Sequence, residues 1–124
     1  MKHILIVDDA ATVRMYHRDI LEGAGYAVDE AVNGIEALEK ALTRPYALYL
    51  VDVNMPKLDG YSFIRELRAQ TTVAQSPAVM ISTEAQPGDL TKAYEAGANF
   101  YIIKPTRPQV LLLHARVLLG EAHA

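Results

Sequence analysis

Residues 4–9 of the chain read Ile-Leu-Ile-Val-Asp-Asp, four apolar residues followed at once by two carboxylates. A short apolar run without polar alternation is typical of a parallel strand that helices cover on both faces. Three further apolar runs end in the same way, at a polar or charged residue: residues 48–51 before Asp52, residues 79–81 before Ser82-Thr83, and residues 100–103 before Lys104-Pro105. Because parallel strands end at one edge of a sheet, these endings are predicted to meet where open α/β sheets bind ligands.

Helical patterns alternate with the apolar runs along the whole chain. We predict strands at residues 3–7, 27–31, 47–51, 78–81 and 99–103. The predicted helices cover residues 13–24 before Gly25, residues 34–43 between a capping Asn33 and Pro45, the segment after Asp59-Gly60, the segment between residues 87–89 and Gly97, and the segment from Pro108 to Gly120. Leu42 is expected to face inward, and the first, third and fifth strands to be buried on both faces. Five β–α units predict an α/β fold, a doubly wound five-stranded parallel sheet in one domain of 124 residues.

Composition narrows the classes of protein to which the chain could belong. It has no cysteine, which excludes disulfides and zinc–thiolate sites and leads us to expect a cytoplasmic protein. Its net charge is −3 and it has no basic stripe, which argues against direct binding of nucleic acid. No apolar stretch is long enough to insert into a membrane, and the first apolar run reaches Asp8 too soon for a signal peptide.

The three aspartates at the strand ends are the first candidates for a site. Asp52 is the candidate nucleophile, because a carboxylate can accept a phosphoryl group as an acyl phosphate. Any aspartate taken alone at such a position would more often cap a turn or a helix. Asp8 and Asp9 would repel Asp52 and raise the carboxyl pKa values unless a cation compensates. Mg²⁺ prefers such oxygen ligands, although the two acids could instead cap the first helix.

Three further side chains complete the predicted site. Lys104 is placed to pair with phosphoryl oxygens, with an ordinary surface lysine as the alternative. Ser82 and Thr83 can each donate a hydroxyl hydrogen bond to a phosphoryl oxygen, with a turn or helix cap as the alternative. Together with the aspartates, these groups predict a metal-dependent phosphoryl site.

The order and spacing of these residues resemble those of the response-regulator receiver domain, specifically its stand-alone chemotaxis (CheY-like) type. The resemblance rests on four motifs: Asp8-Asp9 after the first strand, Asp52-Val53-Asn54-Met55-Pro56 with Asp59-Gly60, Ser82 after the fourth strand, and Ala96-Gly97-Ala98 before Lys104-Pro105. It covers essentially the whole chain. It implies the flavodoxin-like strand order 2-1-3-4-5 and a single receiver domain over residues 1–124, with no output domain.

The resemblance also implies a role for each site residue. Asp52 would be phosphorylated by a histidine kinase, and Lys104 would pair with the phosphoryl group. Mg²⁺ would be bound directly by Asp9, Asp52 and the backbone carbonyl of Asn54, with Asp8 acting mainly through a water. Ser82 would be the switch hydroxyl and Tyr101 the aromatic residue that changes rotamer. Tyr94 and Arg116 are candidates for a partner surface, and Thr83 and Thr106 depart from the residues that are common at their positions.

The function implied is a phosphorylation-controlled binding module rather than an enzyme with an external substrate. The expected partner is the flagellar motor switch, and the expected state is a monomer. A phosphate sink or relay that passes the group to a phosphotransfer protein is the first alternative. A small aspartyl-phosphate phosphohydrolase is another, but Asp52-Val53-Asn54 lacks an acid two residues after the nucleophile. A flavin-binding module would need a Ser/Thr/Gly-rich loop after the first strand.

Overall fold

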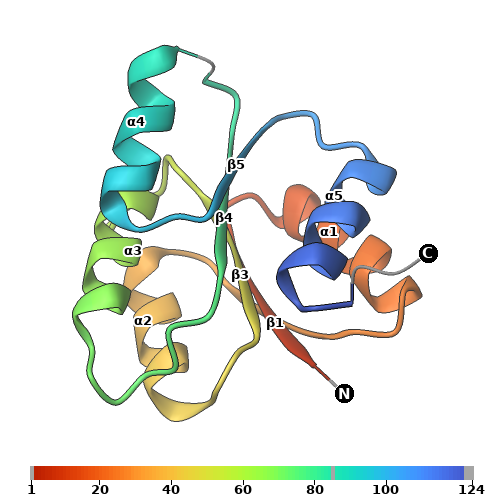
Figure 1. The fold of residues 1–124 in the computed structure, drawn as a ribbon, viewed down its shortest axis with the longest axis horizontal. Coiled ribbons are helices and arrows are strands. Elements are labelled where there is room, and N and C mark those ends of the chain that lie inside the picture. The colour runs from red at the N-terminus through yellow and green to blue at the C-terminus, as the bar shows by residue number, and fades with distance from the viewer. Residues whose placement is uncertain (1, 85, 122–124) are drawn as a thin grey trace.

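The computed structural model describes residues 2–84 and 86–121, which form five β–α units in sequence (Figure 1). The strands are β1 (His3–Val7), β2 (Ala27–Ala31), β3 (Leu48–Asp52), β4 (Ala78–Ser82) and β5 (Phe100–Ile103). The helices are α1 (Ala11–Gly23), α2 (Gly34–Thr43), α3 (Gly60–Ala69), α4 (Pro87–Ala96) and α5 (Pro108–Leu118). All strands are parallel, in the order β2-β1-β3-β4-β5, which confirms the predicted fold and strand order.

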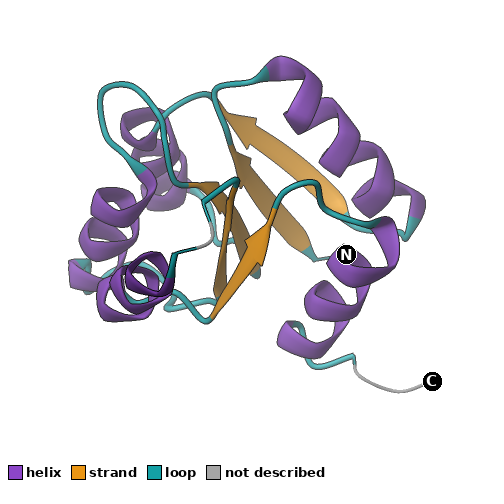
Figure 2. Cartoon of the chain, turned by 90° about the horizontal axis from the view of Figure 1, so that it is seen from above, coloured by secondary structure: helices purple, strands orange, loops and turns teal. Residues whose placement is uncertain are grey.

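Helices cover both faces of the sheet, as Figures 1 and 2 show: α2, α3 and α4 lie on one side and α1 and α5 on the other. Alternate residues of β1 enter two separate cores. Leu5 and Val7 pack with the helices of the first side, whereas Ile4 and Ile6 pack with those of the second. Successive side chains of a strand point to opposite faces, so a strand covered on both sides must be apolar throughout. This is the physical reason for the unbroken apolar run at residues 4–7.

The strands differ from their predicted bounds in ways that bear on the site. β3 begins and ends one residue later than predicted, so Asp52 is its last residue and lies in the sheet ladder opposite Ile81. β4 likewise includes Ser82. The expected burial of the fifth strand on both faces is wrong, because β5 is at the edge of the sheet and leaves Phe100 37% and Ile103 50% exposed.

The helix ends follow the capping signals in the sequence. The Asn33 side chain accepts a hydrogen bond from the Glu36 N–H at the start of α2, as predicted. Gly25, two residues after α1, has φ = +95°, the left-handed conformation that favours glycine. The prediction that Leu42 faces inward is wrong: Ala41 is buried, whereas Leu42, one position further round the helix, is 51% exposed. No helix among the described residues is long and apolar enough to cross a membrane.

Candidate metal centre

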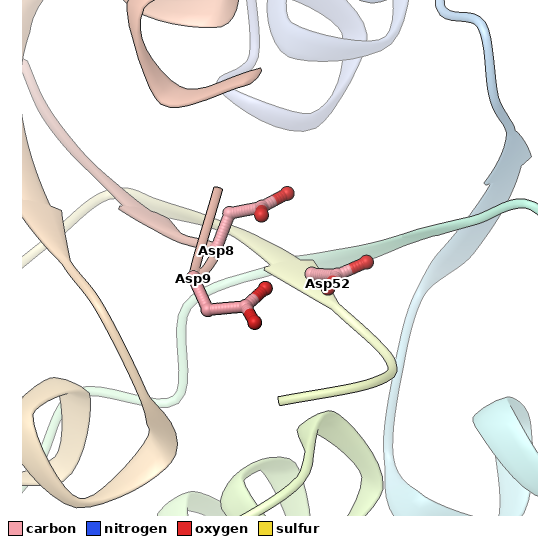
Figure 3. Close-up of side chains that lie close together, drawn as sticks. All are labelled: Asp8, Asp9 and Asp52. Carbon is pink, nitrogen blue, oxygen red and sulfur yellow. The ribbon is translucent and has the colours of Figure 1, made fainter. Parts of the chain in front are cut away.

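The three aspartates meet at the carboxyl edge of the sheet. Val7 pairs with Val51, so Asp8, which follows β1, lies beside Asp52 at the end of β3. One carboxylate oxygen from each of Asp8, Asp9 and Asp52 lies within 4.8 Å of the others (Figure 3). Asp8 and Asp52 are buried, at 3% and 8% exposure, whereas Asp9 is exposed. The cluster is therefore closed on the sheet side and open toward solvent at Asp9.

Lys104 bridges the two buried carboxylates. Its Nζ donates hydrogen bonds to Asp52 Oδ1 at 3.0 Å and to Asp8 Oδ2 at 3.2 Å. Its backbone N–H donates to the Ser82 carbonyl at 2.7 Å, which fixes the loop after β5 against the end of β4. The following Lys104–Pro105 peptide is cis, an isomer that the sequence left undecided. The structure thus brings Lys104 to the aspartates, as the apolar runs predicted.

The charges of this cluster do not cancel. Burial raises the pKa of Asp52, and the nearby charges of Asp8 and Asp9 raise it further, against the hydrogen bond from Lys104. Burial alone would lower the pKa of Lys104, but its hydrogen bond to Asp52 and the charges of Asp52 and Asp8 outweigh that effect and raise it. Three carboxylates against one ammonium leave an excess of negative charge in a half-enclosed site.

This donor set fits a hard divalent cation. The grouped ligand atoms are carboxylate oxygens, which suit Mg²⁺, and the exposed carboxylate of Asp9 leaves one side free for waters and phosphate oxygens. A cation there would also relieve the repulsion that raises the pKa of Asp52. The residues present therefore fit the metal that the sequence predicted.

Comparison with known proteins identifies the family. Residues 4–116 match the response regulator receiver domain. The chain belongs to this family. It is 38% identical to the transcriptional regulatory protein ResD of Bacillus subtilis over 96% of its own length but only 48% of ResD. It is also 38% identical to the chemotaxis protein CheY1 of Helicobacter pylori, covering 94% of this chain and 96% of CheY1.

A solved receiver structure shares the fold and the kind of site. The receiver domain of the sensor histidine kinase PA1611 from Pseudomonas aeruginosa superposes with a TM-score of 0.89 and is 32% identical, covering 96% of this chain and 98% of that one. That structure has a magnesium ion coordinated in its active site cleft. The family, the oxygen donor set and this neighbour agree on an acidic metal-binding pocket.

The predicted switch residues of this receiver share hydrogen bonds with Glu84. Ser82 is fully buried, and its Oγ accepts a hydrogen bond from the Glu84 N–H at 3.0 Å. The Tyr101 hydroxyl donates to the Glu84 carbonyl at 2.9 Å. The Asn54 side chain donates to Glu84 Oε1 at 3.0 Å, while the role of its backbone carbonyl stays a prediction. Glu84 therefore connects the hydroxyls of Ser82 and Tyr101 with the loop after Asp52.

The remaining predicted residues lie on the surface or along a neighbouring cavity. Tyr94 on α4 and Arg116 on α5 are exposed. Thr83 is exposed and lines a cavity of about 400 Å³ together with Tyr16, Lys104 and Thr106. The Thr106 hydroxyl is buried and has no hydrogen-bond partner among the described residues.

Two residues near the site were missed by the sequence analysis. His17 on α1 is only 3% exposed, and burial lowers its pKa, opposed by the charge of Asp8. Arg14 donates a hydrogen bond from Nη1 to the Asp8 carbonyl at 2.8 Å. His17 lies four residues after Val13 and four before Leu21, on the apolar face of the predicted helix, so helical spacing was the signal for its burial. Arg14 lies at the edge of that face, and no sequence signal pointed to its contact with Asp8.

Proposed function

We propose that the chain is a phosphorylation-activated switch of a two-component system, in which Asp52 accepts a phosphoryl group from a histidine kinase with Mg²⁺. One observation carries the proposal: the Asp52 carboxylate lies 3.0 Å from the Lys104 ammonium and within 4.8 Å of the Asp8 and Asp9 carboxylates. This combination provides a nucleophile, a cation for the phosphoryl oxygens and ligands for a metal. The cytoplasmic location expected from the sequence is part of the proposal.

In the proposed reaction, an Asp52 carboxylate oxygen attacks the phosphorus of a phosphohistidine. The N–P bond breaks, the imidazole leaves with the electron pair and is reprotonated from solvent, and Asp52 becomes an acyl phosphate. Such a transfer depends mainly on alignment and charge neutralisation, which the clustered carboxylates, a bound cation and Lys104 would supply. Asp9, Asp52 and the Asn54 carbonyl would hold Mg²⁺ directly and Asp8 through a water. The bound ion would neutralise charge on the phosphoryl oxygens.

The output of the proposed switch is protein binding. Drawing the Ser82 hydroxyl toward the phosphoryl group would break its contact with Glu84, to which Tyr101 is also bonded. Apolar side chains are exposed nearby on α4, β5 and α5, at 47% for Tyr94, 50% for Ile103 and 46% for Val117. A partner that binds one state of this surface better is coupled to phosphorylation.

We infer a chemotaxis role, with the flagellar motor switch as partner, from the similarity to CheY1 over nearly the full length of both chains. Action as a monomer is part of this inference. A sink or relay that exchanges the group with a phosphotransfer protein shares the same acceptor chemistry. The two differ in one measurement: phosphorylation changes the affinity for a motor switch protein in the first case and leaves it unchanged in the second.

The acceptor assignment is tested by incubating the protein with acetyl phosphate and Mg²⁺ and measuring its intact mass. We expect one phosphoryl adduct on the wild type, none on Asp52→Asn, and none after a chelator removes the metal. Asp19→Asn, which changes an exposed aspartate on α1, is the matched control and should keep the adduct. An adduct that persists on Asp52→Asn would contradict the assignment.

A further inference from the structure

The peptide group between Asp8 and Asp9 carries two of the three carboxylates of the site. The Asp8 N–H donates to the Ala31 carbonyl of β2 at 3.1 Å, and the Asp8 carbonyl accepts from Arg14 Nη1 at 2.8 Å. Both backbone groups of Asp8 are therefore held from outside the loop. The orientation of this one peptide decides where the Asp9 side chain projects.

Asp9 depends on that peptide more than Asp8 does. The Asp8 carboxylate is fixed by its own contacts, since it accepts hydrogen bonds from Lys104 and, at 2.9 Å, from the Ala10 N–H. The Asp9 side chain is exposed and makes no hydrogen bond or ion pair with the described residues. Its distance to Asp8 and Asp52 is therefore set by the backbone and by its own rotamer, with no hydrogen bond from another described residue to hold it.

Arg14 is itself held rigidly by the sheet. Its Nε donates to Glu30 Oε1 at 2.7 Å, and its side chain is only 14% exposed. Glu30 precedes Ala31 in β2, and its second oxygen accepts from Arg18. Burial alone would raise the pKa of Glu30, but the hydrogen bonds from Arg18 and Arg14 outweigh it and lower the pKa, so the carboxylate stays charged. A planar guanidinium can hold a carboxylate and a carbonyl at once in fixed geometry, which an ammonium does less well.

We propose that Arg14 is a positioning residue for the metal and phosphoryl site. It connects Glu30 of β2 to the Asp8–Asp9 peptide and so fixes Asp9 at the distance from Asp8 and Asp52 that cation binding needs. Arg14 would touch neither metal nor phosphoryl group. This inference rests on the proposed function, because it concerns the cation that the carboxylates hold.

The test is a Mg²⁺ titration of the full chain followed by ¹⁵N NMR, with thermal unfolding measured on the same samples. Arg14→Gln should weaken Mg²⁺ binding about 10-fold, the size typical when an outer partner of a metal ligand is lost. Arg18→Gln is the matched control, since Arg18 also binds Glu30 but contacts the Val28 carbonyl instead of Asp8. It should leave the Mg²⁺ affinity unchanged. Arg14→Lys should fall between Arg14→Gln and the wild type.

The possible results separate this inference from the proposed function. Wild-type affinity in Arg14→Gln would overturn the positioning role and leave Asp52 phosphorylation intact. An equal loss in Arg18→Gln would also overturn it, because general loosening of α1 on β2 would then explain the effect. A wild type that binds no Mg²⁺ would overturn both. If Arg14→Gln does not fold, Arg14→Lys decides: wild-type affinity in that folded variant overturns the role, and a several-fold loss supports it.

Discussion

Tyr49 is a single residue at which the apolar core contains a buried polar group. It is fully buried in β3, with its ring edge-on to Tyr46 and Phe63 at centroid distances of 5.8 and 6.0 Å. Its hydroxyl has no hydrogen-bond partner within the part of the chain that the structure describes. A buried polar group without a partner costs about 1–3 kcal/mol of stability, so the hydroxyl weakens a position whose ring packs well.

Tyr49→Phe is therefore predicted to raise the free energy of unfolding by about 1 kcal/mol at neutral pH. Burial raises the pKa of Tyr49 to about 12 from an ordinary value of 10.0, so the neutral form is favoured in the folded state. Between pH 10 and pH 12 the Tyr49 hydroxyl ionises in the unfolded chain but stays neutral in the folded protein, so the wild type loses stability as the pH rises through this range. Phenylalanine has no hydroxyl to ionise, so the stability advantage of the variant should grow between pH 10 and pH 12. Urea unfolding at pH 8 and pH 11 measures both effects.

Tyr94→Phe, at an exposed tyrosine, is the control for that experiment and should change neither quantity. A Tyr49→Phe protein less stable than the wild type would show that the hydroxyl has a partner after all.

For individual residues, the sequence predicted that the aspartates and Lys104 would lie together, and the reason is physical. Asp8, Asp52 and Lys104 each follow or end an apolar strand, and parallel strands bring their ends together. The burial of His17 could have been predicted from its spacing to Val13 and Leu21. The proximity of His17 and Arg14 to Asp8 could not, because it depends on the angle at which α1 lies on the sheet. The pattern of apolar residues in one helix does not contain that angle.

The start of α3 determines how this element meets the site. Gly60 is its first residue, and its N–H donates to the Val53 carbonyl at 2.9 Å. A Cβ on Gly60 would lie 2.3 Å from the Asp52 carbonyl oxygen and 2.7 Å from Met80 Cε. The helix can approach Asp52 this closely only because Gly60 has no side chain.

Gly60→Ala is predicted to lower the free energy of unfolding by about 1–3 kcal/mol, because backbone at the end of β3 must shift to relieve the overlap. The same shift moves Asp52 relative to Lys104, so phosphorylation by acetyl phosphate should slow in proportion. Chemical denaturation and the rate of adduct formation report the two effects.

Gly88→Ala is the matched control, since Gly88 lies in the first turn of α4 and a Cβ there meets nothing within 4 Å. Alanine should stabilise that helix by up to about 1 kcal/mol and leave the rate unchanged. Equal behaviour of the two variants would argue against close packing at Gly60.

The apolar patterns predicted the elements in number, kind and order along the chain, whereas the neighbours of each strand in the sheet came only from the family resemblance. The run at residues 100–103 is as apolar as the one at residues 4–7, yet β5 lies at the edge and β1 near the centre. Exposed apolar residues on an edge strand are the ones available to a partner. Without the strand order, the apolar pattern could not distinguish the exposed residues of β5 from core residues.

For the molecule as a whole, gathering the charged residues of the site at one edge of the sheet lowers the stability of the fold. The sheet gathers three carboxylates at one edge, and one ammonium lies among them. Two like charges 4 Å apart repel by about 1 kcal/mol even in water, and more in a half-buried site. Without metal, the fold is therefore destabilised by repulsion among these carboxylates, which a bound cation would remove.

This repulsion predicts that Asp9→Asn is more stable than the wild type without Mg²⁺ and less stable with it. Without metal, Asp9→Asn should unfold at a higher temperature than the wild type, because it removes one repelling charge from an exposed side chain. With Mg²⁺ at 100 times its dissociation constant, the wild type should gain about 2.7 kcal/mol from binding, and Asp9→Asn should gain little. The order of the two melting temperatures should therefore reverse as Mg²⁺ is added. Asp19→Asn should follow the wild type throughout, and an Asp9→Asn protein that gains as much from Mg²⁺ as the wild type would exclude Asp9 as a ligand.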